Sequence, residues 1–199
     1  MTTRSSGWLV TVSLALTLLA GCGDKEDSTP LPSAPASKVL CGFVSADSVA
    51  EALGTTEFEA VGSMPELSGT RNPDGSRLNL ADCTINDDRT TYALRVDVQR
   101  LGIFPVQDQA VVTELARRKP SFVFSPSDGQ GYAEEDVSNE IAGVAHLIRG
   151  DWRYRVYVKN HTPGRDSVSD VAAITRQVVA QLDLPKTGVL PRPTASPSR

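Results

Sequence analysis

The stretch "GVAHLIRGDWRYRVYVK", residues 143–159, decides the fold of this chain. Its centre, Gly150-Asp151, is a two-residue turn of the kind that joins antiparallel strands, and the residues on both sides alternate between apolar and polar. Counting outward from the turn therefore predicts the register of a β-hairpin. The pairs on its core face are Leu147 with Tyr154, Ala145 with Val156, and Gly143 with Val158.

The other face of this hairpin, which we call the reverse face, is predicted to carry cations. His146 is paired with Arg155 there, and Ile148 is paired with Arg153. Tyr157 falls on the same face two residues after Arg155. The hairpin thus predicts a sheet with one buried face and one polar face.

Two further strands are predicted upstream, at residues 78–85 and 91–101, joined across "NDDR". Alternation in the second strand puts one set of side chains on the core face and another on the reverse face. The core set is Tyr92, Leu94, Val96 and Val98, and the reverse set is Arg95, Asp97 and Gln99.

Three amphipathic helices are expected, at residues 45–54, 106–119 and 166–184. Ser45 has the features of an N-cap and Gly54 those of a C-cap, while Val171, Ile174 and Val178 begin an apolar stripe that extends to Leu182. Residues 55–77 read as a long loop with a turn at residues 72–75. The predicted fold class is α+β: an antiparallel sheet with helices packed on one face.

The N-terminus contains a short apolar stretch that ends at a cysteine. Arg4 precedes an apolar stretch from Trp8 to Ala20 that is too short for a comfortable transmembrane helix, and Leu19-Ala20-Gly21-Cys22 resembles a lipobox. We expect cleavage before Cys22 and lipidation of its sulfur. The predicted location is the extracytoplasmic face of the cell membrane, with the lipid at Cys22 as the anchor.

The predicted organisation follows from this anchor. Residues 1–21 are the signal peptide, 22–38 a lipidated cysteine and a disordered Pro/Ser-rich tether, 39–184 a single α+β domain, and 185–199 a disordered tail. The tail contains the end of Leu184-Pro185-Lys186-Thr187-Gly188, a string that sortases cut. The apolar span that should follow a sortase motif is missing, so we expect a chance match.

The cysteines fit an exported protein. Besides Cys22 the chain has only Cys41 and Cys83, an even pair that we expect to form a disulfide in an oxidising compartment. Their wide separation and the lack of a CxxC motif disfavour redox catalysis or a zinc site.

The charge excludes one large class of partner. The mature chain would carry 19 Lys and Arg against 24 Asp and Glu, a net charge of about −5, because the signal peptide contributes only Arg4. Nucleic acid is therefore not expected as a partner. No metal or cofactor is expected either: the acidic run Glu134–Asp136 lacks EF-hand spacing and reads as a solvated loop.

A resemblance adds to this interpretation. The segment "VLCGFVSADSVAEALG", with a cysteine and a glycine before a short helix, resembles a family of small actinobacterial lipoproteins of unknown function. The second cysteine in an early strand and the anchored N-terminus agree with that resemblance. It implies the location, the fold, Cys22 as the lipid site and Cys41 with Cys83 as the bridge, but no catalytic residues.

No catalytic motif accompanies the two histidines, so we expect the chain not to be an enzyme. His161 lies in a turn-forming segment and is expected to be exposed. His146 is expected to be a solvated histidine of the sheet.

Three classes of function remain. The first is a non-catalytic binding or interaction module of the cell envelope, the second a carrier of a lipid or small molecule in an apolar pocket between sheet and helices, and the third, least favoured, an envelope hydrolase. For the first class, the candidate partner is an anionic envelope component or an acidic protein bound by the reverse face. The alternative without a binding function is an ordinary solvated face of the sheet, on which Asp97 balances the positive charges. The candidate binding residues are Arg95, His146, Arg153, Arg155 and Tyr157.

Overall fold

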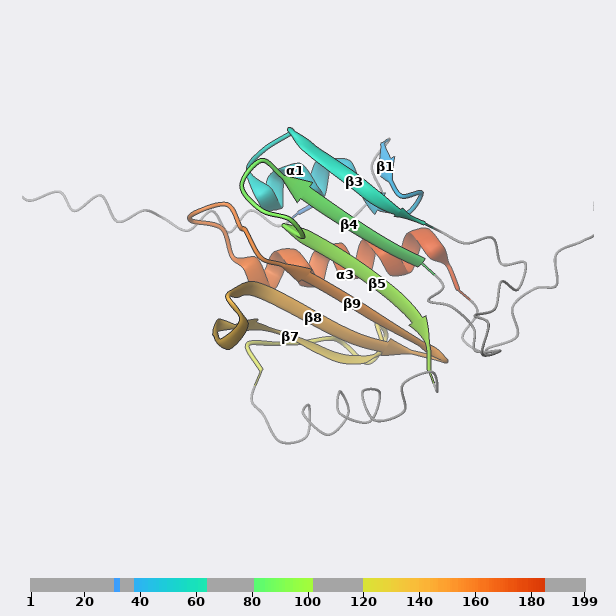
Figure 1. The fold of residues 1–199 in the computed structure, drawn as a ribbon. Coiled ribbons are helices and arrows are strands. Elements are labelled where there is room, and N and C mark those ends of the chain that lie inside the picture. The colour runs from blue at the N-terminus through green and yellow to red at the C-terminus, as the bar shows by residue number, and fades with distance from the viewer. Residues whose placement is uncertain (1–30, 33–37, 64–80, 102–119, 185–199) are drawn as a thin grey trace, which may run out of the picture.

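The computed structural model describes residues 31–32, 38–63, 81–101 and 120–184. These residues form a seven-stranded antiparallel sheet in the order β3-β4-β5-β9-β8-β7-β6, with helices α1 and α3 on one face (Figure 1). A small second sheet pairs β1 (Val39–Leu40) with β2 (Val44–Ser45). The predicted α+β class, with helices on one face of the sheet, is confirmed.

The hairpin at the centre of the sheet has the predicted register. Strand β8 (Ile141–Arg149) turns at Gly150-Asp151 into β9 (Trp152–Val158). Leu147 faces Tyr154 and His146 faces Arg155, so every pair counted from the sequence is confirmed. The pattern succeeded because a two-residue turn leaves no freedom in the pairing that follows it.

The strands upstream differ in detail from the prediction. Strand β4 (Ala81–Asp87) pairs with β5 (Leu94–Arg100), whose Leu94, Val96 and Val98 are fully buried. Tyr92, however, is 50% exposed and was wrongly placed on the core face. It has a positive φ of 62° in the turn before β5, so the alternation of the strand does not reach it.

The segment predicted as a long loop contains the edge strand β3 (Phe58–Ser63). Its partner is β4, along six residue pairs from Phe58–Asp87 to Ser63–Asp82. Phe58 and Ala60 are partly buried and pack against the core. Glycine and acidic residues dilute the apolar alternation of this strand, and its backbone hydrogen bonds to β4 leave no signal in the sequence.

The opposite edge of the sheet corrects a second expectation. It consists of β6 (Phe122–Val123) and β7 (Gln130–Asp136), followed by a 3₁₀ turn at Val137–Asn139. The acidic run Glu134–Asp136, read as a solvated loop, belongs to β7 and pairs with β8. Pairing with the buried strand β8 overrides the low strand propensity of acidic residues.

Helix α1 begins and ends where its predicted caps place it, and α3 ends two residues before the predicted end. In α1 (Ala46–Leu53) the Ser45 side chain accepts a hydrogen bond from Ser48 N, and Gly54 closes the helix in the left-handed conformation. In α3 (Ser167–Leu182) the Asp166 side chain accepts from Val168 N and Ser169 N. Neither these nor any other helix of the described ranges is long and apolar enough to span a bilayer.

Several predictions concern residues outside the described ranges. These are the signal peptide, the lipid site Cys22, the turn at 72–75, the helix at 106–119 and the tail at 185–199.

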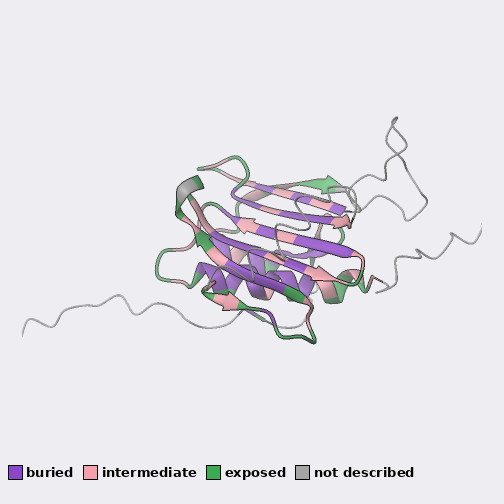
Figure 2. Cartoon of the chain, turned by 90° about the horizontal axis from the view of Figure 1, so that it is seen from below, coloured by how far each residue is buried: buried purple, intermediate pink, exposed green. Residues whose placement is uncertain are grey.

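The space between the sheet and the helices is filled by side chains. Buried and more exposed residues alternate along the strands (Figure 2), and the inward residues form one cluster with the helices. The largest side chains that are fully buried include Trp152, Tyr154, Phe43, Leu53, Ile85, Leu94, Leu147 and Ile174.

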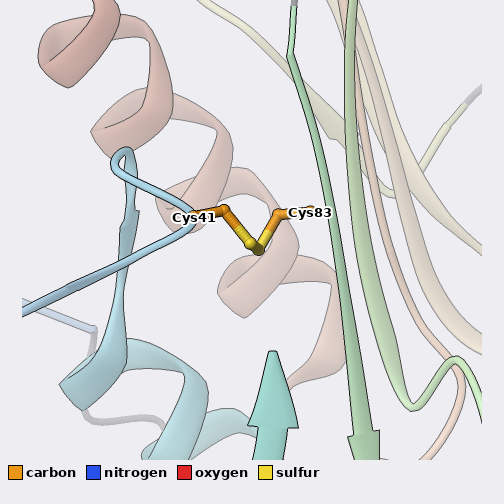
Figure 3. Close-up of a disulfide and its surroundings, with 2 residues drawn as sticks. All are labelled: Cys41 and Cys83. Carbon is orange, nitrogen blue, oxygen red and sulfur yellow. A yellow bond between two sulfur atoms is a disulfide. The ribbon is translucent and has the colours of Figure 1, made fainter. Parts of the chain in front are cut away.

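The predicted disulfide joins the small sheet to the large one. Cys41 lies in the turn between β1 and β2, Cys83 lies in β4, and their Cα atoms are 5.8 Å apart (Figure 3). Cys83 is fully buried on the side of the sheet that the helices cover. The bridge therefore fixes the start of the domain to its core.

Two residues of the predicted tether pack on the domain. Leu31 is 4% exposed and belongs to the core cluster. The backbone oxygen of Pro32 accepts a hydrogen bond from Gln177 Nε2 of α3. The tether therefore touches the helical side of the domain before it reaches β1.

Candidate functional site

The register brings the five candidate residues onto one face. Arg95 of β5 is opposite Tyr157 of β9, and Arg155 of β9 lies between Asp97 of β5 and His146 of β8. Arg153 follows on the same face, two residues before Arg155. Arg153 is buried and the other four are half-buried, so the reverse face is more enclosed than the sequence suggested.

Arg95 is neutralised by its neighbour along the strand. Its Nη2 atom lies 2.8 Å from Oδ1 of Asp97, and Nε donates to the same oxygen at 2.9 Å. Burial would lower the pKa of Arg95, but the charge of Asp97, and then Tyr157, raise it. At Arg95 the geometry therefore agrees with the alternative interpretation, in which Asp97 balances the cations of a polar sheet face.

Arg153 is not presented to solvent as expected. It is only 6% exposed, and its Nη2 atom donates to Oε1 of Gln99 at 2.8 Å. Gln99 is the residue of β5 directly opposite Arg153. The guanidinium of Arg153 therefore forms a side-chain hydrogen bond between β9 and β5.

His146 is partly buried rather than solvated, which corrects the sequence-based expectation. Burial, and then the charges of Arg155 and Arg153, lower its pKa to about 4, against a smaller opposing effect of Asp136. Its ring is tilted against that of Tyr132, with 5.3 Å between centroids. His146 is thus neutral at pH 7 and adds no positive charge to the reverse face.

Arg155 is the cation of this face with unused hydrogen-bonding capacity. Its guanidinium carbon lies 5.3 Å from the centroid of the Tyr157 ring, a cation–π contact. Its Nε is buried and has no hydrogen-bond partner among the residues that the structure describes. Buried donors are usually satisfied, so the missing acceptor marks Arg155 as the residue of this face with an unmet hydrogen bond.

A hollow of about 640 Å³ lies at the β6–β7 edge of the sheet, beside the hairpin turn. Val123 of β6 and Ile148 of β8 form apolar parts of its wall, and Arg149 stands at its rim. Val123 is 56% exposed. Arg149 Nη1 donates to the backbone oxygens of Ser127 and Asp128, both at 3.2 Å, which holds the loop before β7 against the hairpin turn.

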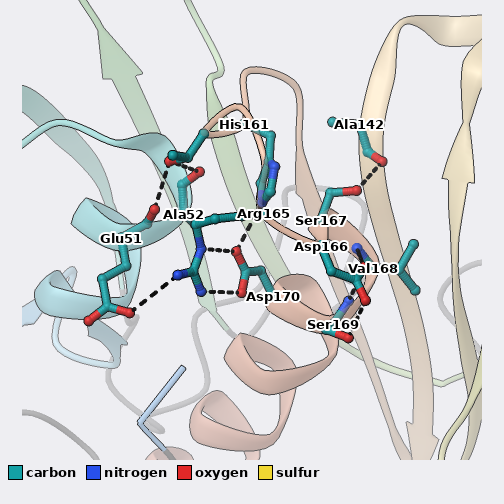
Figure 4. A network of polar contacts seen from close by, with 11 residues as sticks. Glu51, Ala52, Ala142, His161, Arg165, Asp166, Ser167, Val168, Ser169 and Asp170 are labelled. Atoms are coloured by element: carbon teal, nitrogen blue, oxygen red, sulfur yellow. Dashed lines mark hydrogen bonds and ion pairs between the residues drawn. The ribbon is translucent and has the colours of Figure 1, made fainter. Parts of the chain in front are cut away.

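A second polar cluster lies at the start of α3 (Figure 4). His161 Nε2 is 2.9 Å from Oδ2 of Asp170, and Arg165 contacts both oxygens of that carboxylate, through Nε at 2.9 Å and Nη2 at 2.8 Å. Burial would raise the pKa of Asp170, but the hydrogen bonds from His161 and Arg165 lower it below its ordinary value. The side chain of His161 is only 8% exposed, so its prediction as an exposed loop residue is wrong.

This cluster fastens the connection between β9 and α3 to helix α1. Thr162 Oγ1 donates to the backbone oxygens of Glu51 and Ala52 at 2.8 and 3.0 Å, and Arg165 Nη1 approaches Glu51 at 4.0 Å. Among the described contacts, His161 meets Asp170 and no hydroxyl or thiol. The arrangement therefore has the geometry of a structural clasp between two helices.

Sequence reasoning missed Asp170 and Arg165 as members of a site. The available signal was an aspartate beside the apolar stripe of α3, which places a carboxylate at the edge of the core. Within the described ranges, no group of three or more His, Cys, Asp or Glu side chains is arranged to hold a metal ion.

Comparisons with known proteins add no family. No family model matches the chain, and a search of the curated proteins finds no match. The resemblance to the actinobacterial lipoproteins therefore stays a prediction.

Proposed function

We propose that this protein is an extracytoplasmic lipoprotein, anchored in the cell membrane through Cys22, and that its domain is a non-catalytic interaction module of the cell envelope. The reverse face is the proposed binding surface. Its proposed partner is an anionic envelope component or an acidic protein, which offers carboxylate or phosphate oxygens to arginine.

The observation that carries this proposal is the unpaired Nε of Arg155. The other cations of the face are engaged: Arg95 binds Asp97, and Arg153 binds Gln99. Arg155 has its guanidinium stacked on Tyr157, which orients it without using its donors. An oxyanion placed beside it would satisfy a donor that is otherwise buried without a partner.

The filled core favours this proposal over a carrier. A carrier requires an apolar cavity between sheet and helices, but Leu147, Val156 and Ile174 are at most 1% exposed there and belong to one packed cluster. The hollow beside Val123 lies at the β6–β7 edge of the sheet instead. The hydrolase alternative lacks support from the histidines, since His161 contacts a carboxylate that Arg165 already holds.

Substitution of Arg155 tests the binding surface. We expect Arg155→Gln to abolish salt-sensitive retention of the purified protein on isolated cell envelope, because the free donor and its charge are lost together. Lys159→Gln is the matched control: it removes the same charge from an exposed residue at the end of β9. Equal retention of both variants and the unsubstituted protein would refute the proposed surface, provided that all three have the same circular dichroism spectrum.

Substitution of Cys22 tests the anchor. Metabolic labelling with a fatty-acid analogue should mark the unsubstituted protein and leave Cys22→Ser unlabelled and outside the membrane fraction, because one lipidated cysteine is the only proposed anchor. Deletion of residues 185–199 should leave membrane partition unchanged. Membrane partition of Cys22→Ser would exclude the lipobox, and loss of surface attachment on the deletion would favour a sortase instead.

A further inference from the structure

The tether is attached to the domain at one described point. Leu31 is buried to 4% exposure in the core cluster, whereas the neighbouring Pro32 is exposed and uses its backbone oxygen. That oxygen accepts the hydrogen bond from Gln177, a residue that is itself 3% exposed. The tether thus supplies a buried leucine and, next to it, a backbone acceptor for a buried amide donor of α3, which makes a specific contact rather than a chance approach of a linker.

The attachment lies on the side of the domain opposite to the proposed binding surface. Gln177 belongs to α3, and α3 covers the face of the sheet that carries Leu147 and Val156. Arg155 and Tyr157 point from the same strand to the other face, as their alternation with Val156 requires. Figure 1 displays α3 on one side of the sheet only.

The attachment also shortens the tether. Only residues 23–30 separate Cys22 from Leu31, and an extended chain of that length spans at most about 30 Å. Without the attachment, residues 23–38 would span about 55 Å. A compact domain of this size is about 40 Å across, so a path along its surface from one face to the other is about 60 Å long.

We infer that Leu31 and Pro32 fasten the tether to the helical face, so that a lipid at Cys22 holds this face towards the membrane and directs the reverse face away from it. This inference rests on the proposed lipid anchor. It narrows the proposed partner to an anionic component on the far side of the domain, such as a wall polymer, and excludes the phosphate headgroups of the membrane that holds the protein.

The test uses the full lipidated protein in vesicles whose headgroups carry a fluorescence quencher. One fluorophore is attached at Gln181→Cys, an exposed position one turn after Gln177 on α3, and another at Val123→Cys, an exposed position on the reverse face. The helical-face probe should be quenched severalfold more than the reverse-face probe. Equal quenching, or stronger quenching at residue 123, would overturn the inference.

Two changes to the tether complete the experiment. Leu31→Asp should detach the segment and bring the two quenching values together, while Val39→Asp, the same change at a residue that is 38% exposed, should not. Inserting about sixteen Gly and Ser residues after Asp27 should also bring the two quenching values together, because the longer tether lets the domain turn over. The attachment of Leu31 and Pro32 to the domain stays intact in this variant.

The outcomes separate this inference from the proposed function. If the unsubstituted protein does not bind to the vesicles, the proposed lipid anchor is wrong and the proposed orientation is overturned with it. If the protein binds to the vesicles, and the variant with the lengthened tether keeps the original difference in quenching between the two probes, the lipid anchor stands and only the orientation is overturned.

Discussion

Buried charged and titratable side chains of this domain depend on specific neighbours. Asp170 is held by two cationic or polar partners, while His146 lies beside two arginines and remains neutral. Both environments displace a pKa, and each displacement links folding stability to pH. The two groups have opposite charge types, yet both cause stability to fall as the pH falls.

His146 should make the domain less stable in mildly acidic solution. Its pKa is about 4 in the folded protein and about 6.5 in the unfolded chain, so the unfolded chain binds more protons between these values. The free energy of unfolding should therefore fall by about 2 kcal/mol between pH 7 and pH 5. Urea unfolding of His146→Gln at both pH values should show a loss of stability that is smaller by this amount. An equal loss between pH 7 and pH 5 in the variant and the unsubstituted protein would contradict the prediction.

Asp170 should stabilise the domain at neutral pH through its two partners. Asp170→Asn leaves Arg165, whose side chain is 7% exposed, without its carboxylate, and should lower the free energy of unfolding at pH 7 by about 3 kcal/mol. Because the folded pKa of Asp170 is lowered, its contribution is present above about pH 4 and is lost as the pH falls through the folded pKa.

The measurement is chemical unfolding from pH 7 to pH 3, where the difference between Asp170→Asn and the unsubstituted protein should narrow. Asp88→Asn, at a side chain that is 76% exposed, serves as the control and should change stability little. A variant at Asp170 that matched this control at pH 7 would rule out the clasp as a source of stability.

At the scale of elements, helix α3 crosses the central hairpin closely because β8 has a glycine at the crossing point. A Cβ atom added to Gly143 would lie 2.7 Å from the backbone oxygen of Ser167, the first residue of α3. Ser167 Oγ also donates to the backbone oxygen of Ala142 at 2.7 Å. The start of the helix is thus seated directly on the strand.

Gly143→Ala should therefore separate the start of α3 from β8. We expect a loss of about 2 kcal/mol in the free energy of unfolding, as in other overpacked cores. Gly164→Ala is a useful comparison, because it has a φ of 81° and no atom within 4 Å of the added Cβ, so that only backbone strain of about 1 kcal/mol is expected. The steric argument fails if Gly143→Ala is the milder of the two variants by urea denaturation.

At the scale of the whole molecule, the disulfide connects the small sheet to the large one. It closes a loop of 42 residues, for which the loss of chain entropy in the unfolded state predicts about 4 kcal/mol. Replacing both cysteines, as Cys41→Ser with Cys83→Ser, should lower the melting temperature by about 10 °C. Reductant should produce a similar decrease in the unsubstituted protein and none in the double variant; a melting temperature insensitive to both would refute the prediction.

Local patterns were sufficient for the hairpin, the helix caps and the disulfide partners. The register of β8 and β9 follows from one two-residue turn, and the bounds of α1 follow from Ser45 and Gly54, which act within four residues of themselves. The disulfide needed only the number of cysteines and an export signal. For the hairpin and α1 the physical cause lies within the segment that carries the pattern, and for the disulfide only one pairing was open once Cys22 was assigned to the lipid.

Contacts between distant segments decided the rest. Strand β3 depends on backbone pairing with β4, and the clasp around Asp170 depends on α1 meeting the start of α3. The attachment of the tether depends on the hydrogen bond between Pro32 and Gln177, which are more than 140 residues apart. The enclosure of His146 and Arg153 likewise depends on neighbours from other strands. Burial and pKa are properties of the environment that packing creates, so no periodicity along the chain reports them.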